Sequence, residues 1–234
     1  MRVLITGATG MVGRSALHAA LESPTISHVT ALVRRPIART STKLSVQLHQ
    51  DFTDYTSIVD IFSSHDAIWW CLGISQTKVT SEAEYIRITY EYAVAAARAA
   101  LAVNPKVKFL FVSGAGADPS ESSKTLFRRI KGRTERALAE MPFASEALYL
   151  LRPAGIIPGP EGNSEGPTFE RLLYPVLAML RPVLPTYVIR APELAEAMCT
   201  ITTSAIPANI RADFTKLGNA AIVHNRQLIE LSRT

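Results

Sequence analysis

The fold of this chain is decided by its opening stretch, Met1-Arg-Val-Leu-Ile-Thr-Gly-Ala-Thr-Gly-Met-Val-Gly-Arg14. Residues 3–5 form a short apolar, β-branched run, which is typical of a strand buried on both faces. Apolar residues at helical spacing then continue from Met11 to Leu21. Strand, glycine-rich turn and helix therefore follow one another without a gap.

The spacing of the three glycines in this stretch has a physical reason. A pyrophosphate must approach bare backbone at a helix N-terminus, where unpaired N–H groups and the positive end of the helix dipole face it. Gly7 would supply the sharp turn, Gly10 the close approach, and Gly13 the room for the helix to lie against the strand. A glycine-rich turn without a ligand is the alternative, and the flanking strand and helix favour the dinucleotide site.

Length and composition favour one α/β domain with a substantial core, because the chain has 234 residues, of which 47% are hydrophobic and 19% charged. Cys71 and Cys199 lie far apart, so we expect neither a disulfide nor a metal site but two small buried residues in a reducing compartment. No basic leader precedes the first strand, and no apolar stretch reaches the roughly 20 residues that span a bilayer. We therefore expect a soluble, cytoplasmic protein without membrane contact.

The net charge of +5 is concentrated on one predicted helix. Segment 124–136 carries six lysines or arginines against Glu135 alone. A basic helix can follow nucleic-acid phosphates, but no aromatic stacking platform accompanies this one, so we favour a solvated helix face and predict no nucleic-acid partner. The same charge disfavours helix-on-helix dimerisation, and we expect a monomer or a weak homodimer.

The rest of the chain alternates strands with helices, which indicates βαβ units and a doubly wound, mostly parallel Rossmann sheet. Strands are expected at residues 28–33, 45–49, 66–73, 107–112 and 148–153, and helices at 82–101, 124–140, 169–180, 192–203 and from 225 onward. Residues 1–153 would form the dinucleotide-binding core of a single domain, and residues 154–234 a small substrate cap with the C-terminal helices. The loop 158–168 would line the substrate pocket.

The end of the second strand indicates which nicotinamide dinucleotide binds. An acid at this point would accept the 2′-hydroxyl of NAD, whereas arginine pairs with the 2′-phosphate of NADP. Arg34 and Arg35 follow the strand, no acid lies between Leu32 and Thr42, and Arg14 follows the third glycine. The sequence therefore favours NADP(H), the alternative being a pair of surface arginines.

Two later strand ends add contacts to the adenosine. Asp51 could bond the adenine amino group or cap the helix that leads to Ile61, and Phe52 follows it. Leu72 and Gly73 would lie alongside the adenosine after the fourth strand.

At this point the sequence resembles the short-chain dehydrogenase/reductase superfamily in its atypical, extended branch. The resemblance is greatest to the Tat-interacting-protein oxidoreductases and more distant to the NmrA-like proteins. It is carried by Gly7-Ala-Thr-Gly-Met-Val-Gly-Arg14, Cys71-Leu-Gly73, Ser113 with Gly116-Ala-Asp118, Lys131-Gly132, Arg152-Pro153 and Asn219-Ala-Ala-Ile222.

The resemblance implies an NADP-binding Rossmann domain in which a serine on the fifth strand and a Tyr-x-x-x-Lys motif hold the nicotinamide and act in catalysis. Ser113 matches the serine and Lys131 the lysine, but the tyrosine position is Phe127. No lysine of the chain has a tyrosine four residues before it. The predicted cofactor-binding residues are Gly7, Thr9, Gly10, Met11, Val12, Gly13, Arg14, Arg34, Arg35, Asp51, Phe52, Leu72, Gly73, Ser113, Lys131 and Pro153.

Phe127 leaves three interpretations open, because loss of a positioned acid costs about 10²- to 10⁴-fold in rate. The protein could still transfer hydride to a small, partly apolar carbonyl compound, with Ser113, Tyr85, Tyr90 or a water held by Lys131 as proton donor. It could instead bind NADP without turnover, as a redox-responsive partner protein. In the third interpretation the pocket guides a non-redox isomerisation or cyclisation.

Overall fold

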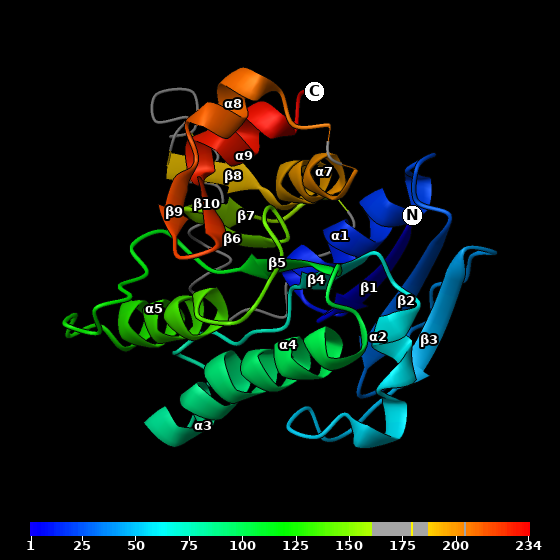
Figure 1. Ribbon diagram of the computed structural model, residues 1–234, viewed down its shortest axis with the longest axis horizontal. Coiled ribbons are helices and arrows are strands. Elements are labelled where there is room, and N and C mark those ends of the chain that lie inside the picture. Colours follow the sequence, from blue (N-terminus) through cyan, green and yellow to red (C-terminus); the bar gives the residue numbers. More distant parts are fainter. Residues whose placement is uncertain (161–178, 180–186, 204) are drawn as a thin grey trace.

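The computed structural model describes residues 1–160, 179, 187–203 and 205–234. An eight-stranded sheet in the order β3-β2-β1-β4-β5-β6-β10-β9 runs through the centre of the chain, and all neighbouring strands pair in parallel except β9 with β10 (Figure 1). A second sheet pairs β7 with β8. The predicted mostly parallel α/β Rossmann fold is confirmed.

The sheet strands are β1 (Arg2–Thr6), β2 (His28–Val33), β3 (Leu44–Leu48), β4 (Ala67–Trp70), β5 (Lys108–Val112), β6 (Leu148–Arg152), β9 (Thr215–Leu217) and β10 (Ala220–His224). The smaller sheet comprises β7 (Gly155–Ile157) and β8 (Val188–Arg190). The described helices are α1 (Met11–Glu22), η1 (Thr56–Ile58), α2 (Asp60–Ser63), α3 (Glu82–Ile86), η2 (Arg87–Glu91), α4 (Tyr92–Val103), α5 (Leu126–Ala139), α7 (Ala191–Thr202), α8 (Ala208–Ala212) and α9 (Asn225–Leu231).

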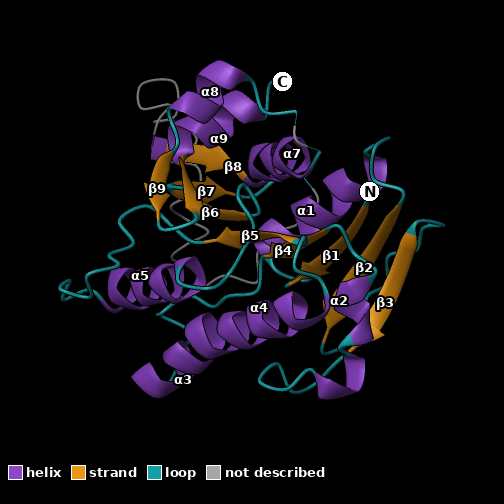
Figure 2. Ribbon diagram, viewed as in Figure 1, coloured by secondary structure: helices purple, strands orange, loops and turns teal. Residues whose placement is uncertain are grey.

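Helices cover both faces of the sheet, as Figure 2 shows. Alternate residues of β1 divide between two apolar clusters: Val3 and Ile5 pack toward α1, α7 and α9, whereas Leu4 packs toward α2, α4 and α5. All three side chains are fully buried, which explains the unbroken apolar run in the sequence.

Two predicted elements end or bend differently from expectation. β4 stops at Trp70 instead of continuing to Gly73, because its neighbour β1 ends at Thr6 and the chain then turns at Gly7. The helix expected over residues 82–101 is interrupted by the π-helical turn η2, which inserts an extra residue into the helical register.

The described C-terminal residues belong partly to the main sheet. β10 pairs in parallel with β6 and carries β9 as an antiparallel edge strand. The three strands β7, β8 and β9 and the helix α8 were not predicted, whereas β10 matches the apolar stretch expected at 220–223. The loop expected at 158–168 and the helix expected at 169–180 lie mostly outside the described residues, and the substrate cap stays a prediction.

One buried hydrogen bond joins the central sheet to the C-terminal region. The indole Nε1 of Trp69 on β4 donates to Thr202 Oγ1 at the end of α7 over 2.7 Å, and both side chains are fully buried. The bond therefore fixes α7 against the middle of the sheet.

We expect Thr202→Val to lower the free energy of unfolding by about 1–3 kcal/mol, because the valine fills the same space but leaves the indole N–H buried without an acceptor. Denaturant unfolding monitored by circular dichroism measures the loss. The control Thr203→Val, whose hydroxyl bonds the local carbonyl of Cys199, should stay within about 0.5 kcal/mol of the parent. Trp69→Phe should cost less in Thr202→Val than in the parent, because it also removes the N–H that has lost its acceptor, and equal stability of both threonine variants would contradict the assignment.

Candidate functional site

The turn between β1 and α1 presents free backbone amides at the carboxyl edge of the sheet. Gly10 donates its N–H to the carbonyl of Gly7 over 2.9 Å, and the first helical bond runs from Arg14 N to Gly10 O. The amides of residues 11–13 precede that bond, so they have no acceptor within the helix. No acidic side chain lies in the first turn, and no side chain caps it. An anionic group is the partner that suits this helix end.

Gly7 and Gly13 are required by close packing. Gly7 has a φ of +68°, and a Cβ there would lie 2.7 Å from the backbone of Cys71 and Leu72. A Cβ on Gly13 would overlap the carbonyl of Gly7. The turn therefore touches both the end of β4 and the first turn of α1 through backbone alone.

A cleft of about 160 Å³ opens beside this turn. It is bounded by three successive strand ends, those of β1, β2 and β4. Its lining residues are Gly7, Thr9, Gly10, Leu32, Val33, Arg34, Arg35, Phe52, Cys71, Leu72 and Gly73. Two of the predicted glycines, the two arginines and three of the predicted adenosine contacts (Phe52, Leu72 and Gly73) therefore meet in one place.

Other predicted cofactor residues lie around the cleft without lining it. Met11, Val12 and Gly13 form the first turn of α1. Arg14 donates from Nε to the carbonyl of Thr9 over 2.9 Å and lines a neighbouring cavity with Arg39.

Asp51 bonds its own turn. Its Oδ1 accepts from Thr53 N at 2.9 Å and from Thr53 Oγ1 at 2.5 Å, and these bonds lower the pKa of the carboxyl. The alternative in which Asp51 caps the following helix is wrong, because Asp54 accepts from the amide of Thr56 at the start of η1. Contact with adenine stays a prediction.

Ser113 and Lys131 meet at the carboxyl end of β5. Lys131 Nζ donates to Val112 O over 2.8 Å and would lie 3.9 Å from a Cβ on Gly73, at the margin of the cleft. Burial lowers the pKa of Lys131 to about 8. Ser113 is 7% exposed, and its Oγ is buried without a partner among the described residues. An unpaired buried hydroxyl beside an ammonium group is suited to receive a polar ligand atom.

Phe127 packs its ring against this same segment. A Cβ on Gly114 would overlap Phe127 Cζ, so the ring lies directly on the residue after Ser113. Pro153 accepts a bond from Ala115 N at 2.7 Å and fixes the other side of the segment.

The tyrosines considered as alternative acids lie elsewhere. Tyr85 is fully buried, and Tyr90 lies under Arg133, whose Cζ is 4.4 Å from the ring centroid. Neither residue lines the cleft.

Sequence reasoning missed two residues at the site. Cys71 lines the cleft and is half-buried, where a buried residue without a site role was expected, and desolvation raises the pKa of its thiol to about 12. Its position directly before the predicted Leu72 was the available signal. Gln76 accepts a bond from Phe127 N at its Oε1 over 3.1 Å, and no pattern in the sequence pointed to it.

A buried ion pair lies next to Lys131 on α5. Glu135, one helical turn further along α5, has a fully buried side chain and binds Arg152 through two bonds of 2.9 and 2.5 Å. The pair ties α5 to the end of β6.

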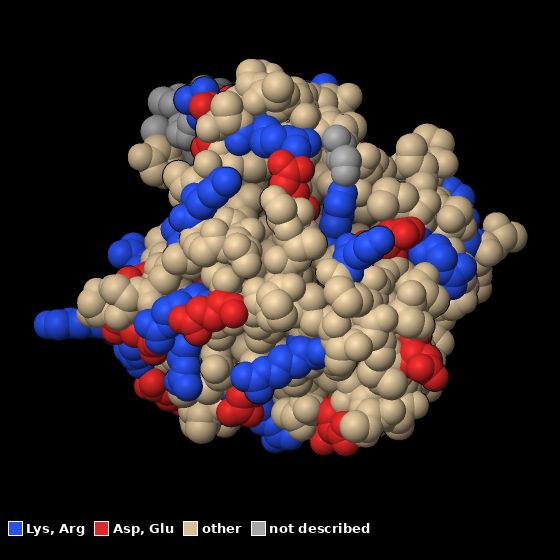
Figure 3. All heavy atoms as spheres, in the orientation of Figure 1, with Lys and Arg blue, Asp and Glu red and all other residues tan. Residues whose placement is uncertain are grey.

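Two arginines of the basic helix pair with acidic side chains of the same molecule. Arg129 pairs with Glu82 at 2.7 Å, and Arg136 pairs with Glu121. Figure 3 shows basic and acidic side chains intermixed on the face it presents. The described helices include none with the length and apolar character needed to cross a membrane.

Comparison with known proteins gives a family and two groups of relatives. The profile of the NAD dependent epimerase/dehydratase family matches residues 3–139. "Protein FMP52, mitochondrial" of Candida albicans is 31% identical over 169 residues, covering 71% of each chain. Its namesake from Coccidioides immitis is 31% identical over 160 residues, covering 64% of this chain but only 63% of the relative, so less than two thirds of that protein is matched.

Among solved structures, the UDP-glucuronic acid 4-epimerase of Bacillus cereus in complex with NAD has a TM-score of 0.62 at 12% identity, covering 96% of this chain and 78% of its own. This likeness concerns the fold. The names of the fungal relatives contradict the expectation of a cytoplasmic protein, because they are mitochondrial proteins. A location is not encoded in the residues that build the sheet and the cleft.

We expect Glu135→Gln to lower the free energy of unfolding by about 3–5 kcal/mol, because the change leaves the charge of Arg152 buried without its partner. Thermal and urea unfolding measure the effect. The matched control is Glu82→Gln, which breaks the solvent-exposed pair with Arg129 and should cost at most about 1 kcal/mol. Similar losses in both variants would show that the buried pair has no special role.

Proposed function

The chain belongs to the NAD dependent epimerase/dehydratase family, and from that premise we propose that it is an NADP(H)-binding atypical short-chain dehydrogenase/reductase that reduces a small, partly apolar carbonyl compound. The single observation that carries the proposal is the cleft in which free helix amides, two arginines and the ends of three parallel strands meet. The closer likeness to Tat-interacting-protein oxidoreductases stays a prediction based on the shared motifs.

The adenosine end of the cleft supports NADP(H) over NAD(H). Arg34 and Arg35 are exposed, line the cleft and have no acidic partner among the described residues. A guanidinium group binds a phosphate through parallel charge-assisted bonds, so either arginine suits the 2′-phosphate. The turn at Gly7 and Gly10 would hold the pyrophosphate on the amides of residues 11–13.

The nicotinamide end would lie beside Ser113, Lys131 and Gly73. The bound cofactor supplies a hydride to the carbonyl carbon. The unpaired Oγ–H of Ser113 is suited to donate to the carbonyl oxygen, which becomes more basic as the hydride arrives. Lys131 is the described acid next to this segment, and a pKa near 8 keeps it mostly protonated at neutral pH while it can still release the proton that the oxygen needs.

Phe127 also favours a second candidate function, binding of NADP without turnover. The ring lies on Gly114, where a reductase of this superfamily would hold its tyrosine, and it has no proton to give. A redox-responsive partner protein would need the cofactor cleft but no proton donor. The non-redox isomerase or cyclase remains the third reading of the same pocket.

We also propose that this protein resides in mitochondria, because the names of its fungal relatives place those proteins there. Cell fractionation with an antibody against the chain tests the location, and recovery in the cytosolic fraction alone would overturn it.

The first prediction of this function concerns cofactor choice. The protein should bind NADPH more tightly than NADH, and Arg34→Gln with Arg35→Gln should weaken NADPH at least about tenfold while leaving NADH unchanged, since only NADPH carries the 2′-phosphate. Fluorescence titration or calorimetry measures both constants. Arg98→Gln, an exposed arginine of α4, is the control. Equal affinities in the parent, or tighter NADH, would overturn the assignment.

The second prediction concerns Phe127. Phe127→Tyr should introduce or raise carbonyl reduction, by up to about 10²- to 10⁴-fold, because it places a proton donor against Gly114, the residue that follows Ser113. NADPH oxidation with a panel of aldehydes and quinones measures the gain, and Phe127→Leu controls for altered packing. Unchanged turnover in Phe127→Tyr, with NADPH still bound, would favour the sensor or isomerase readings over hydride transfer.

A further inference from the structure

We propose that the substrate of this site carries a carboxylate or phosphate in addition to its carbonyl group, and that Arg128 binds this anion. The inference rests on the proposed function and names the class of substrate. It follows from the way in which α5 packs along residues 112–118, the segment that contains Ser113.

The first two turns of α5 follow residues 112–118 closely. Lys131 contacts Val112 through its ammonium group, and the ring of Phe127 lies on Gly114. Further along, Arg128 lies against Gly116, where its Nε would be 3.1 Å from a Cβ and its Cζ 3.5 Å. The guanidinium therefore lies three residues along the segment from Ser113, and the phenyl ring stands between the two.

Backbone contacts fix the position of Arg128. Its carbonyl accepts from Asp118 N at 2.9 Å, which fixes the helix against the segment. Gly116 has a φ of +81° and no side chain, so the arginine can lie directly on its backbone. An alanine at that position would meet the guanidinium.

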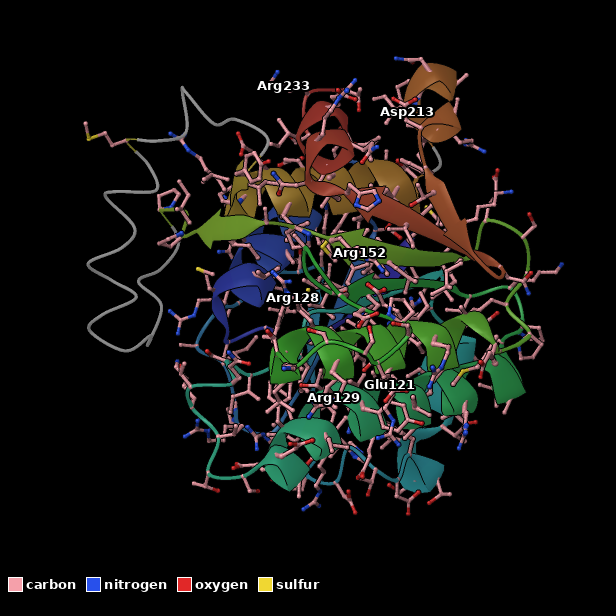
Figure 4. All side chains as sticks on the ribbon, turned by 90° about the vertical axis from the view of Figure 1, so that its left-hand side faces the viewer. Glu121, Arg128, Arg129, Arg152, Asp213 and Arg233 are labelled. Carbon is pink, nitrogen blue, oxygen red and sulfur yellow. The ribbon has the colours of Figure 1, made fainter. Side chains whose placement is uncertain are left out.

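Within the part of the chain that the structure describes, Arg128 differs from the other cations of α5 in that its guanidinium pairs with no side chain or carbonyl. Arg129 and Arg136 pair with acids, Lys131 bonds a carbonyl, and Arg133 lies on the ring of Tyr90. Arg128 is exposed, and the described residues offer it no acid. Figure 4 shows Arg128 on the side of α5 that faces Arg152 and the sheet, and Arg129 on the opposite side toward α3 and α4.

The two unpaired groups define the two ends of one ligand. Among the described residues the buried Oγ of Ser113 has no acceptor, which suits a carbonyl oxygen, and the guanidinium of Arg128 has no anion. The ring of Phe127 between them favours an apolar or aromatic spacer. The expected substrate is thus a carbonyl compound with a short apolar linker and a terminal carboxylate or phosphate.

The test compares para-carboxybenzaldehyde with its methyl ester as substrates for NADPH-dependent reduction. The parent protein should prefer the acid by at least about tenfold in kcat/KM, the discrimination that one charge-assisted contact supplies. Arg128→Gln should bring the ratio close to one without changing reduction of the ester or the Kd for NADPH, and Arg128→Lys should restore part of it. Arg129→Gln, the neighbouring arginine, should leave the ratio unchanged. Glyceraldehyde phosphate against glyceraldehyde distinguishes a phosphate from a carboxylate preference.

A binding measurement keeps the inference separate from turnover. Benzoate should bind the NADP-saturated parent at least about tenfold more tightly than benzamide in calorimetry, and Arg128→Gln should abolish the difference. If cofactor binds and no aldehyde is reduced, the reductase proposal fails, while the benzoate titration still decides the role of Arg128. Equal binding of benzoate and benzamide by the parent, or an unchanged difference in Arg128→Gln, would overturn the inference.

Discussion

The absence of a side chain at Gly7 is the constraint on which the site depends. The backbone of Gly7 is packed against the end of β4 on one side and against Gly13 of α1 on the other, with no space for a Cβ at either glycine. This contact sets the distance between the first helix and the central strands. It also leaves the amides of the first turn facing outward at the point where β1, β2 and β4 end. A methyl group at Gly7 or Gly13 would push the helix away from the sheet, and the same movement would close the cleft.

The central sheet could be predicted from the sequence because its strands are buried on both faces. Continuous apolar runs, such as that of β5, indicate where the strands lie. Their alternation with amphipathic helices predicts that neighbouring strands pair in parallel. The three-residue strands β7, β8 and β9 are too short to show a period, and they exist because neighbouring backbone is available to pair with them. The π turn η2 was equally invisible, since insertion of one residue does not change composition.

For the site, sequence reasoning could name the residues that a motif fixes but not those that tertiary contacts recruit. Gly7, Gly10, the two arginines and most of the predicted adenosine contacts line one cleft because the carboxyl ends of parallel strands share an edge. Lys131 was identified, whereas its pKa near 8 depends on burial, which no motif contains. The contacts of Gln76 with Phe127, and of Arg128 with Gly116, join segments whose proximity exists only after α5 has packed.

The placement of β10 has a consequence for how the chain reaches its final state during synthesis. This strand follows β6 and β9 in the chain, pairs with β6 along one side and carries β9 along the other. Until β10 has been synthesised, the growing chain presents an open strand edge at β6, and its core lacks the apolar side chain of Val223. The sheet is therefore completed only once β10 has formed, and a chain that lacked β10 would retain the residues of the cleft yet expose the strand edge at β6, along which chains can aggregate.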